Sequence, residues 1–145
     1  MSLQTDKIFW NAVRNNPSLM QKVGDRVFNP ADEDGGEFGE NTDVPYLIIT
    51  FDGLTNDVST KDSYESGTDE VTISIEIAAT CRAELADIAQ TVRDTIKAYI
   101  ESRTSADEDF DLVPYDYRFS AGPVMFEWMK PCVWQTLSYV CDTKA

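Results

Sequence analysis

Residues 70–101 read EVTISIEIAATCRAELADIAQTVRDTIKAYIE, and this stretch decides the fold. Apolar and polar residues alternate at its start, which predicts a strand from Glu70 to Ala79 with one apolar, buried face and one polar, solvent-exposed face. Apolar residues then recur every three or four positions, which predicts a long helix from about Arg82 to Glu101, with Thr80 as its N-cap. The apolar stripe of that helix consists of Leu85, Ile88, Ala89, Val92, Ile96, Tyr99 and Ile100. A strand that leads into a helix with one apolar stripe indicates a helix packed on one face of a sheet.

The segment before residue 70 predicts a short N-terminal helix, a second helical turn and two strands. Apolar spacing and cap residues define the helices, since Thr5 and Asn16 suit N-caps, Pro17 suits the first turn and Gly24 suits a C-terminal stop. The strand that begins at Pro45 is apolar on both faces, which favours a central position in the sheet. The expected bounds are Asp6–Asn15 for the first helix, Pro17–Gly24 for the second, and Arg26–Asn29 and Pro45–Gly53 for the strands.

The last third of the chain is rich in aromatic residues and alternates as strands do. Segments 113–119, 124–128 and 133–141 are the expected strands, with a turn at Gly122 and Pro123. Most of these aromatic residues are expected to face the long helix and the others to form a contact surface. The chain is therefore predicted to be one α+β domain over residues 1–145. It has a mostly antiparallel mixed sheet, one long helix on one face, a short N-terminal helix, and flexible loops at 31–43 and 54–69.

Composition argues against catalysis. The chain contains no histidine, which removes the usual catalytic dyads and triads and the commonest metal ligand. Phosphate-binding and nucleophile motifs are also missing from the sequence, so we expect no enzyme activity, no cofactor and no metal. Cys81, Cys132 and Cys141 are expected to be buried, reduced thiols of a cytoplasmic protein. No signal peptide or membrane-spanning run is expected.

The net charge of −14 comes largely from two short acidic clusters that contain no Lys or Arg. Such a charge argues against general nucleic-acid binding and against docking on an anionic membrane. The clusters suit solvated loops, or loops that repel a passing phosphate backbone. A calcium site of the EF-hand type is disfavoured, because Leu112 and Arg118 stand where Gly and Glu belong. A pair of glycosidase carboxylates is disfavoured because nothing there would separate their pKa values. The clusters are Asp32, Glu33, Asp34, Glu37, Glu40 and Asp43, and Asp107, Glu108, Asp109 and Asp111.

The order of elements and several short strings give the chain a family resemblance. VGDRVF at 23–28, PYLIITFDG at 45–53, and the strand that runs through Thr-Cys-Arg into an Ala-rich helix carry it. Over residues 6–100 the chain resembles the minor tail proteins of long-tailed phages and prophages called tail terminator, tail completion or head–tail joining proteins. The acidic insert at 31–43 and the aromatic C-terminal strands depart from that family pattern.

The resemblance implies a structural protein that self-associates into a ring, often of six subunits. The ring caps the tail tube and joins it to the head connector, so the expected partners are the tail tube protein and the head connector protein. The expected location is the host cytoplasm during assembly and then the virion tail. DNA would pass without specific binding, and acidic side chains would line the bore. The residues expected at the bore are Asp32, Glu33, Asp34, Glu37, Glu40, Asp107, Glu108 and Asp109.

Two regions are expected to make the subunit contacts. One is the polar connection 54–69, which could also be a disordered linker, and the other is the aromatic strand near residue 126, which could also be core. The alternative function is an acidic inhibitor that mimics DNA or another non-enzymatic interaction module, and a small-molecule binding or enzymatic domain is a third possibility. The expected contact residues are Asp57, Lys61, Tyr64, Glu65, Phe126, Trp128 and Met129.

Overall fold

The computed structural model describes residues 2–29, 42–56, 67–127 and 132–144 of the chain. The elements follow one another as three helices and six strands with two single 3-10 turns, within these residues. They are η1 (Ser2–Gln4), α1 (Asp6–Arg14), α2 (Pro17–Val23), β1 (Val27–Phe28), β2 (Tyr46–Thr55), β3 (Thr68–Ala79), α3 (Arg82–Ser102), η2 (Phe110–Leu112), β4 (Asp116–Ala121), β5 (Met125–Glu127) and β6 (Cys132–Lys144).

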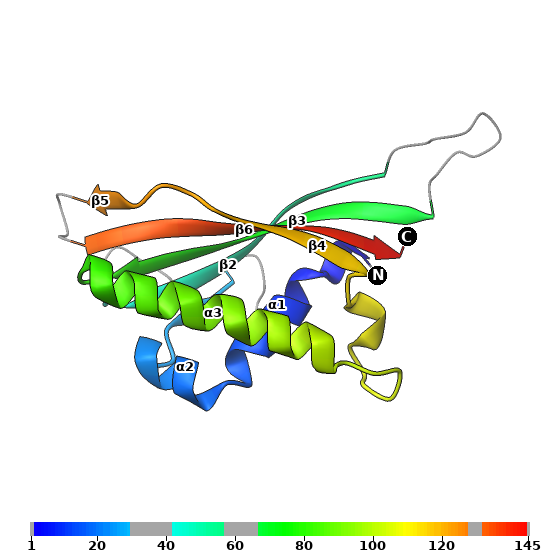
Figure 1. Ribbon diagram of the computed structural model, residues 1–145, viewed down its shortest axis with the longest axis horizontal. Coiled ribbons are helices and arrows are strands. Elements are labelled where there is room, and N and C mark those ends of the chain that lie inside the picture. Colours follow the sequence, from blue (N-terminus) through cyan, green and yellow to red (C-terminus); the bar gives the residue numbers. More distant parts are fainter. Residues whose placement is uncertain (1, 30–41, 57–66, 128–131, 145) are drawn as a thin grey trace.

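The strands form one sheet in the order β1-β2-β3-β6-β4, and β5 also pairs with β6. All pairings are antiparallel except that of β1 with β2. Figure 1 shows α1, α2 and α3 on the same side of this sheet, with α3 running across it. No described element covers the opposite side. The predicted α+β fold, with a mostly antiparallel mixed sheet and one long helix on one face, is confirmed.

The core lies between the sheet and the helices. The odd-numbered residues of β3 from Val71 to Ile77 are fully buried, as are four residues of the predicted α3 stripe, and the ring of Tyr139 in β6 is 1% exposed. Burial of each such Leu or Ile side chain contributes about 1.5–3 kcal/mol. Tyr139 is the centre of an aromatic cluster, with ring centroids 5.0 Å from Phe9, 5.6 Å from Tyr117 and 5.2 Å from Phe119. The buried stripe residues of α3 are Leu85, Ile88, Val92 and Ile96.

The start of α2 confirms the prediction. The Asn16 side-chain oxygen accepts a hydrogen bond from the Leu19 backbone N–H (3.2 Å), Pro17 occupies the first turn, and Gly24 ends the helix in the left-handed conformation with φ 59°. The Asn16 amide also donates to the Thr95 hydroxyl of α3 (2.8 Å). One side chain therefore caps α2 and joins it to the long helix.

Of the other two predicted caps, Thr5 occupies the N-cap position of α1 as predicted but makes no side-chain capping hydrogen bond, and the Thr80 prediction is wrong. Thr5 precedes α1, but its buried hydroxyl donates to the Ser2 carbonyl oxygen (2.6 Å) and does not cap the helix. The N-cap of α3 is Cys81, one residue after the predicted Thr80, and its side chain makes no capping hydrogen bond. Instead, the Glu84 carboxylate accepts from the Thr80 backbone N–H (3.1 Å) and hydroxyl (3.2 Å). Glu84 thus reaches back to the start of the helix as in a capping box.

Several strand predictions need correction. Strand β2 pairs with β1 only at Leu47 and Ile48, so its later half is a sheet edge, and β3 and β6 are the central strands. β2 and β3 extend into the predicted 54–69 connection, of which residues 57–66 lie outside the described residues. The strand predicted from residue 113 begins only at Asp116, because residues 110–112 form a 3-10 turn.

Burial of the cysteine and aromatic residues also differs in part from expectation. Cys132 and Cys141 are buried, and burial raises the pKa of the Cys141 thiol to about 12, but Cys81 is exposed at the start of α3. Phe110, Tyr115 and Phe126 are 41%, 65% and 48% exposed. Among the described aromatic residues from Phe110 onward, those that pack in or against the core are Tyr117, Phe119 and Tyr139, on the helix side of β4 and β6. In the described part of the chain, no helix is long and apolar enough to cross a membrane.

Candidate functional site

The uncovered side of the sheet presents a row of hydroxyl groups. Strand register places Thr50, Ser74, Ser138 and Ser120 side by side across β2, β3, β6 and β4. The two outer members, Thr50 and Ser120, are exposed, and the two inner ones are partly buried. Because side chains alternate between faces, these four lie opposite the core residues of the same strands. The side chains in the middle of the open face are therefore small and polar.

The two ends of this open face differ in chemistry. At one end, the Arg118 guanidinium lies 3.1 Å from Glu70 and 3.7 Å from Asp142. At the other end, register aligns Tyr46, Ala78, Trp134 and Met125 in an apolar row. Between the ends, burial raises the pKa of the Glu76 carboxyl above its ordinary value.

The sheet has a free edge on each side. On one side, β4 pairs with β6 alone. On the other, residues of β2 after Ile48 pair with β3 alone. Neither stretch has a strand on its outer side within the described residues, so each presents backbone N–H and C=O groups that another strand could pair with. Both edges carry the same arrangement, with hydroxyl groups on the open side and partly buried aromatic rings, Phe51 and Phe119, on the helix side.

A small hollow lies on the helix side of the β4 edge. Its volume is about 150 Å³, and Ala86, Ala89, Arg93 and Phe119 are among its lining residues. The Arg93 guanidinium lies over the Phe119 ring, 4.3 Å from its centroid. Among the residues that the structure describes, no carboxylate lies within 4.0 Å of this guanidinium. The β4 edge is therefore bordered by cations from both of its faces.

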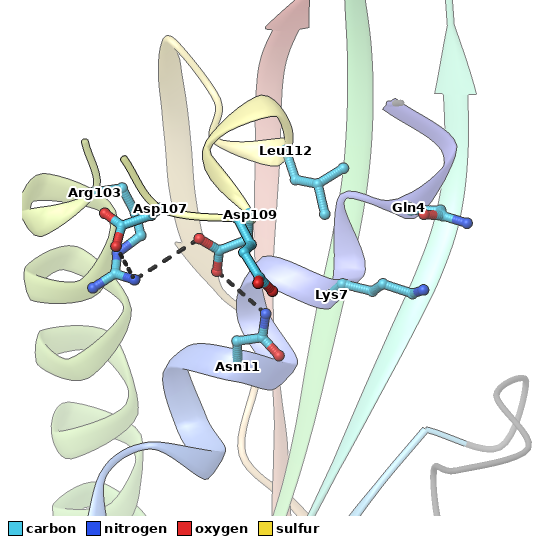
Figure 2. Close-up of a pocket in the computed structure, with 8 residues that line it drawn as sticks. Gln4, Lys7, Asn11, Arg103, Asp107, Asp109 and Leu112 are labelled. Carbon is cyan, nitrogen blue, oxygen red and sulfur yellow. Dashed lines mark hydrogen bonds and ion pairs between the residues drawn. The ribbon is translucent and has the colours of Figure 1, made fainter. Parts of the chain in front are cut away.

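A larger, open pocket of about 510 Å³ separates α1 from the turn after α3 (Figure 2). It contains three of the four acids of the second cluster together with two basic side chains, Lys7 and Arg103. Figure 2 shows Asp107 and Asp109 directed toward Arg103 and Asn11, whereas Lys7 and Gln4 point away from them. Its lining residues are Gln4, Lys7, Asn11, Arg103, Asp107, Glu108, Asp109 and Leu112.

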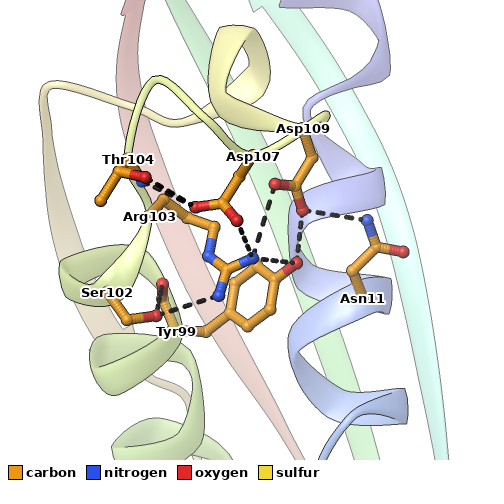
Figure 3. A network of polar contacts seen from close by, with 7 residues as sticks. All are labelled: Asn11, Tyr99, Ser102, Arg103, Thr104, Asp107 and Asp109. Carbon is orange, nitrogen blue, oxygen red and sulfur yellow. Dashed lines mark hydrogen bonds and ion pairs between the residues drawn. The ribbon is translucent and has the colours of Figure 1, made fainter.

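Two carboxylates of this pocket, those of Asp107 and Asp109, belong to a structural network (Figure 3). Arg103 lies 3.5 Å from Asp107 and 3.8 Å from Asp109. Asp109 accepts hydrogen bonds from the Asn11 amide (3.2 Å) and from the Tyr99 hydroxyl. Burial, and then the hydrogen bond to Asp109, raise the pKa of Tyr99 to about 12. The network fastens the turn after α3 to α1.

The structure describes only part of the predicted site. Phe126 lies in β5 opposite Val133 and is 48% exposed. Asp107 and Asp109 are half-buried in the network, and Glu108 is exposed at the pocket. None of these positions tests the bore or the subunit contacts, which stay predictions. The other predicted residues lie outside the described residues: Asp32, Glu33, Asp34, Glu37, Glu40, Asp57, Lys61, Tyr64, Glu65, Trp128 and Met129.

Sequence reasoning missed the two sheet edges and the cations beside β4. The alternation of residues in β4 predicts on which side of the sheet Arg118 lies. Only the pairing of β4 with β6 shows that Arg118 meets Glu70 and Asp142. Arg93 falls outside the apolar stripe of α3, which marks it as a surface residue and no more. In the described ranges, no group of three or more Cys, Asp and Glu side chains is arranged to hold a metal ion.

Comparison with known proteins identifies a shared fold. No protein family and no curated protein matches the sequence. A solved structure described as "Virion of native gene transfer agent (GTA) particle" contains a similar chain, with a TM-score of 0.55 and 14% sequence identity. The similarity covers 97% of this chain and 94% of that chain. At this identity the two chains share a fold over nearly their whole lengths.

Proposed function

We propose that the chain is a structural protein of a phage-like virion that closes the end of the tail tube and joins the tail to the head. The observation that carries this proposal is the end-to-end likeness to a chain of a gene transfer agent virion. The resemblance of residues 6–100 to tail terminator proteins points in the same direction and comes from independent strings of sequence.

The described residues suit an assembly role better than a catalytic one. Histidine is absent from the chain, and Asp107 and Asp109 of the pocket beside α1 are engaged by Arg103, Tyr99 and Asn11. By contrast, among the described residues the sheet has one face that no element covers and two edges that no further strand pairs with. A ring requires two different surfaces on each subunit, one to meet each neighbour, and opposite edges of one sheet provide such a pair.

In this proposal, copies of the chain form a ring in the host cytoplasm and then remain in the virion tail. One side of the ring meets the tail tube protein, and the other meets the head connector. DNA passes through the ring without specific contacts, since a net charge of −14 opposes adhesion to phosphates.

Deletion of the gene from its native genome tests this function. We expect electron microscopy of the deletion strain to show DNA-filled heads without tails and tails of irregular length without heads. Expression of the gene in trans should restore joined particles. Normal joined particles in the deletion strain would refute the proposal.

The high negative charge favours one alternative, an inhibitor that mimics DNA. A mimic needs acids exposed on the folded surface, yet Asp107 and Asp109 are half-buried beside Arg103. A salt titration separates the two functions, because mimicry requires a DNA-binding partner whose binding to this chain weakens steeply as salt rises. Capture of such a partner at low salt would favour the mimic.

A further inference from the structure

The two free edges of the sheet run in directions that allow copies to join in series. Strands β2, β3, β6 and β4 alternate in direction, so β2 and β4 are antiparallel to each other across one subunit. A rotation about an axis along the strands preserves strand direction. It therefore brings β4 of one copy beside β2 of the next as an antiparallel pair.

The extent of the two edges limits the register in which β4 of one copy can pair with β2 of the next. Strand β4 contains six residues, Asp116–Ala121. On β2, strand β1 occupies the outer side only as far as Ile48, and β2 ends at Thr55. A β-bulge between Phe51 and Gly53 interrupts β2, so Ile49–Phe51 of a second copy can pair with Phe119–Ala121 of β4 without meeting β1.

Backbone hydrogen bonds support the same register. The Gly122 N–H donates to the Thr136 carbonyl of β6 (2.9 Å), so the alternate residues Phe119 and Ala121 direct their backbone groups away from β6. The Leu47 N–H donates to the Arg26 carbonyl (2.9 Å), so Phe51 likewise directs its backbone groups away from β3. When Ile49–Phe51 pairs with Phe119–Ala121, Phe119 lies opposite Phe51 of the second copy, and the backbone N–H and C=O groups of both residues point toward the partner strand.

Side chains in this register are complementary on both faces. On the open face, Ser120 meets the second copy's Thr50, which continues the hydroxyl row from one subunit to the next. Arg118 comes near the exposed Asp52, an opposite charge, at the β-bulge that follows Phe51. On the helix side, two partly buried aromatic rings meet and shield each other from water.

We propose that copies of this chain associate through their sheet edges, with Phe119–Ala121 of one copy pairing antiparallel to Ile49–Phe51 of the next so that Ser120 lies opposite Thr50. The inference deepens the proposed ring and rests on it, since it names the surfaces that join its subunits. It also leaves the open face of every sheet on the same side of the assembly, so that the hydroxyl rows form one continuous band.

Disulfide trapping tests this register directly. Cys81 is exposed, so all variants carry Cys81→Ser to remove its reactivity, while Cys132 and Cys141 are buried. Thr50→Cys and Ser120→Cys are made in separate chains, and both replace exposed residues, so folding should be unaffected. Opposed residues of a pair without mutual hydrogen bonds have Cα atoms about 4.5 Å apart, within disulfide range.

We expect rapid disulfide formation when the two variants are mixed and little when either is oxidised alone. A chain that carries both cysteines should give a ladder of oligomers that ends at the closed ring. Disulfides in either single variant alone would indicate twofold pairing of identical edges and would overturn the proposal. The absence of a disulfide in the mixture would also overturn it.

A charge substitution provides a second readout. Asp52→Arg places two cations near each other and should weaken self-association about fivefold, as measured by sedimentation at physiological salt, since exposed pairs contribute up to about 1 kcal/mol. The control Asp43→Arg makes the same charge change at an exposed residue before β2 and should have little effect. Equal effects of the two variants would contradict the register.

Different experimental results would overturn the edge pairing and the proposed tail function. Rings seen by electron microscopy without the Thr50–Ser120 disulfide would overturn the edge pairing and leave the ring intact. Normal particles in the deletion strain would refute the tail function whatever the disulfide result. A wild-type chain that stays monomeric to about millimolar concentration would overturn the edge pairing, since free edges should pair at that concentration.

Discussion

The hydroxyl of Tyr139 is expected to destabilise the fold. Its ring is 1% exposed at the centre of the aromatic cluster, and among the described residues its hydroxyl is a buried group with no hydrogen-bond partner. A buried polar group without a partner costs about 1–3 kcal/mol. Tyr139→Phe removes the hydroxyl and keeps the ring contacts to Phe9, Tyr117 and Phe119, so the free energy of unfolding should rise by about 1–3 kcal/mol.

Thermal and urea denaturation followed by circular dichroism measure this effect. For a chain of this size, 1 kcal/mol corresponds to roughly 3 °C in Tm, so Tyr139→Phe should raise Tm by about 3–9 °C. The control Tyr117→Phe alters a half-buried member of the same cluster and should change Tm little. A lower Tm for Tyr139→Phe would show that the hydroxyl has a stabilising partner and would refute the reasoning.

The same substitution should change the response to alkali. Burial raises the pKa of Tyr139 in the folded state above its ordinary value of 10.0. A raised folded-state pKa means that stability is complete below the unfolded pKa and falls as pH rises above about 10. Tyr139→Phe should therefore lose less stability than wild type between pH 9 and pH 11.5, measured as Tm at each pH. Identical slopes for the two proteins would contradict this.

Other predictions concern the caps and the open face. Cys81→Ser supplies the missing side-chain cap of α3 and should raise the free energy of unfolding by about 0.5–1 kcal/mol in urea denaturation, whereas Cys81→Ala should not. Asn16→Ala removes both the α2 cap and the hydrogen bond to Thr95, so it should lower the free energy of unfolding by about 1–2 kcal/mol in urea denaturation. An unchanged free energy of unfolding would show that solvent replaces both hydrogen bonds. The pKa of Glu76 is raised by burial, so its charged form opposes folding at neutral pH. Glu76→Gln should raise Tm at pH 7 and lose this advantage near pH 3, and the opposite pH trend would refute the assignment.

Much of the fold could be predicted because it depends on short-range patterns. The alternation of Glu70–Ala79 and the stripe of α3 each need only a few neighbouring residues, and both are confirmed. The end of α2 at Gly24 was also predictable, since a left-handed residue with φ 59° favours glycine. The N-cap of α3 was missed by one residue because Thr80 and Cys81 are adjacent and tertiary packing decides which one precedes the first helical residue.

The class of fold, the acidity, the lack of histidine and the resemblance to tail proteins can all be read from the order of amino acids. Strand pairing was needed to show which strands lie at the edges, which face of the sheet no described element covers, and that Arg118 meets Glu70 and Asp142. The physical reason is that helix periodicity and strand alternation are local, whereas strand order and register depend on pairing between segments far apart in the chain. The surfaces available for assembly follow from that pairing.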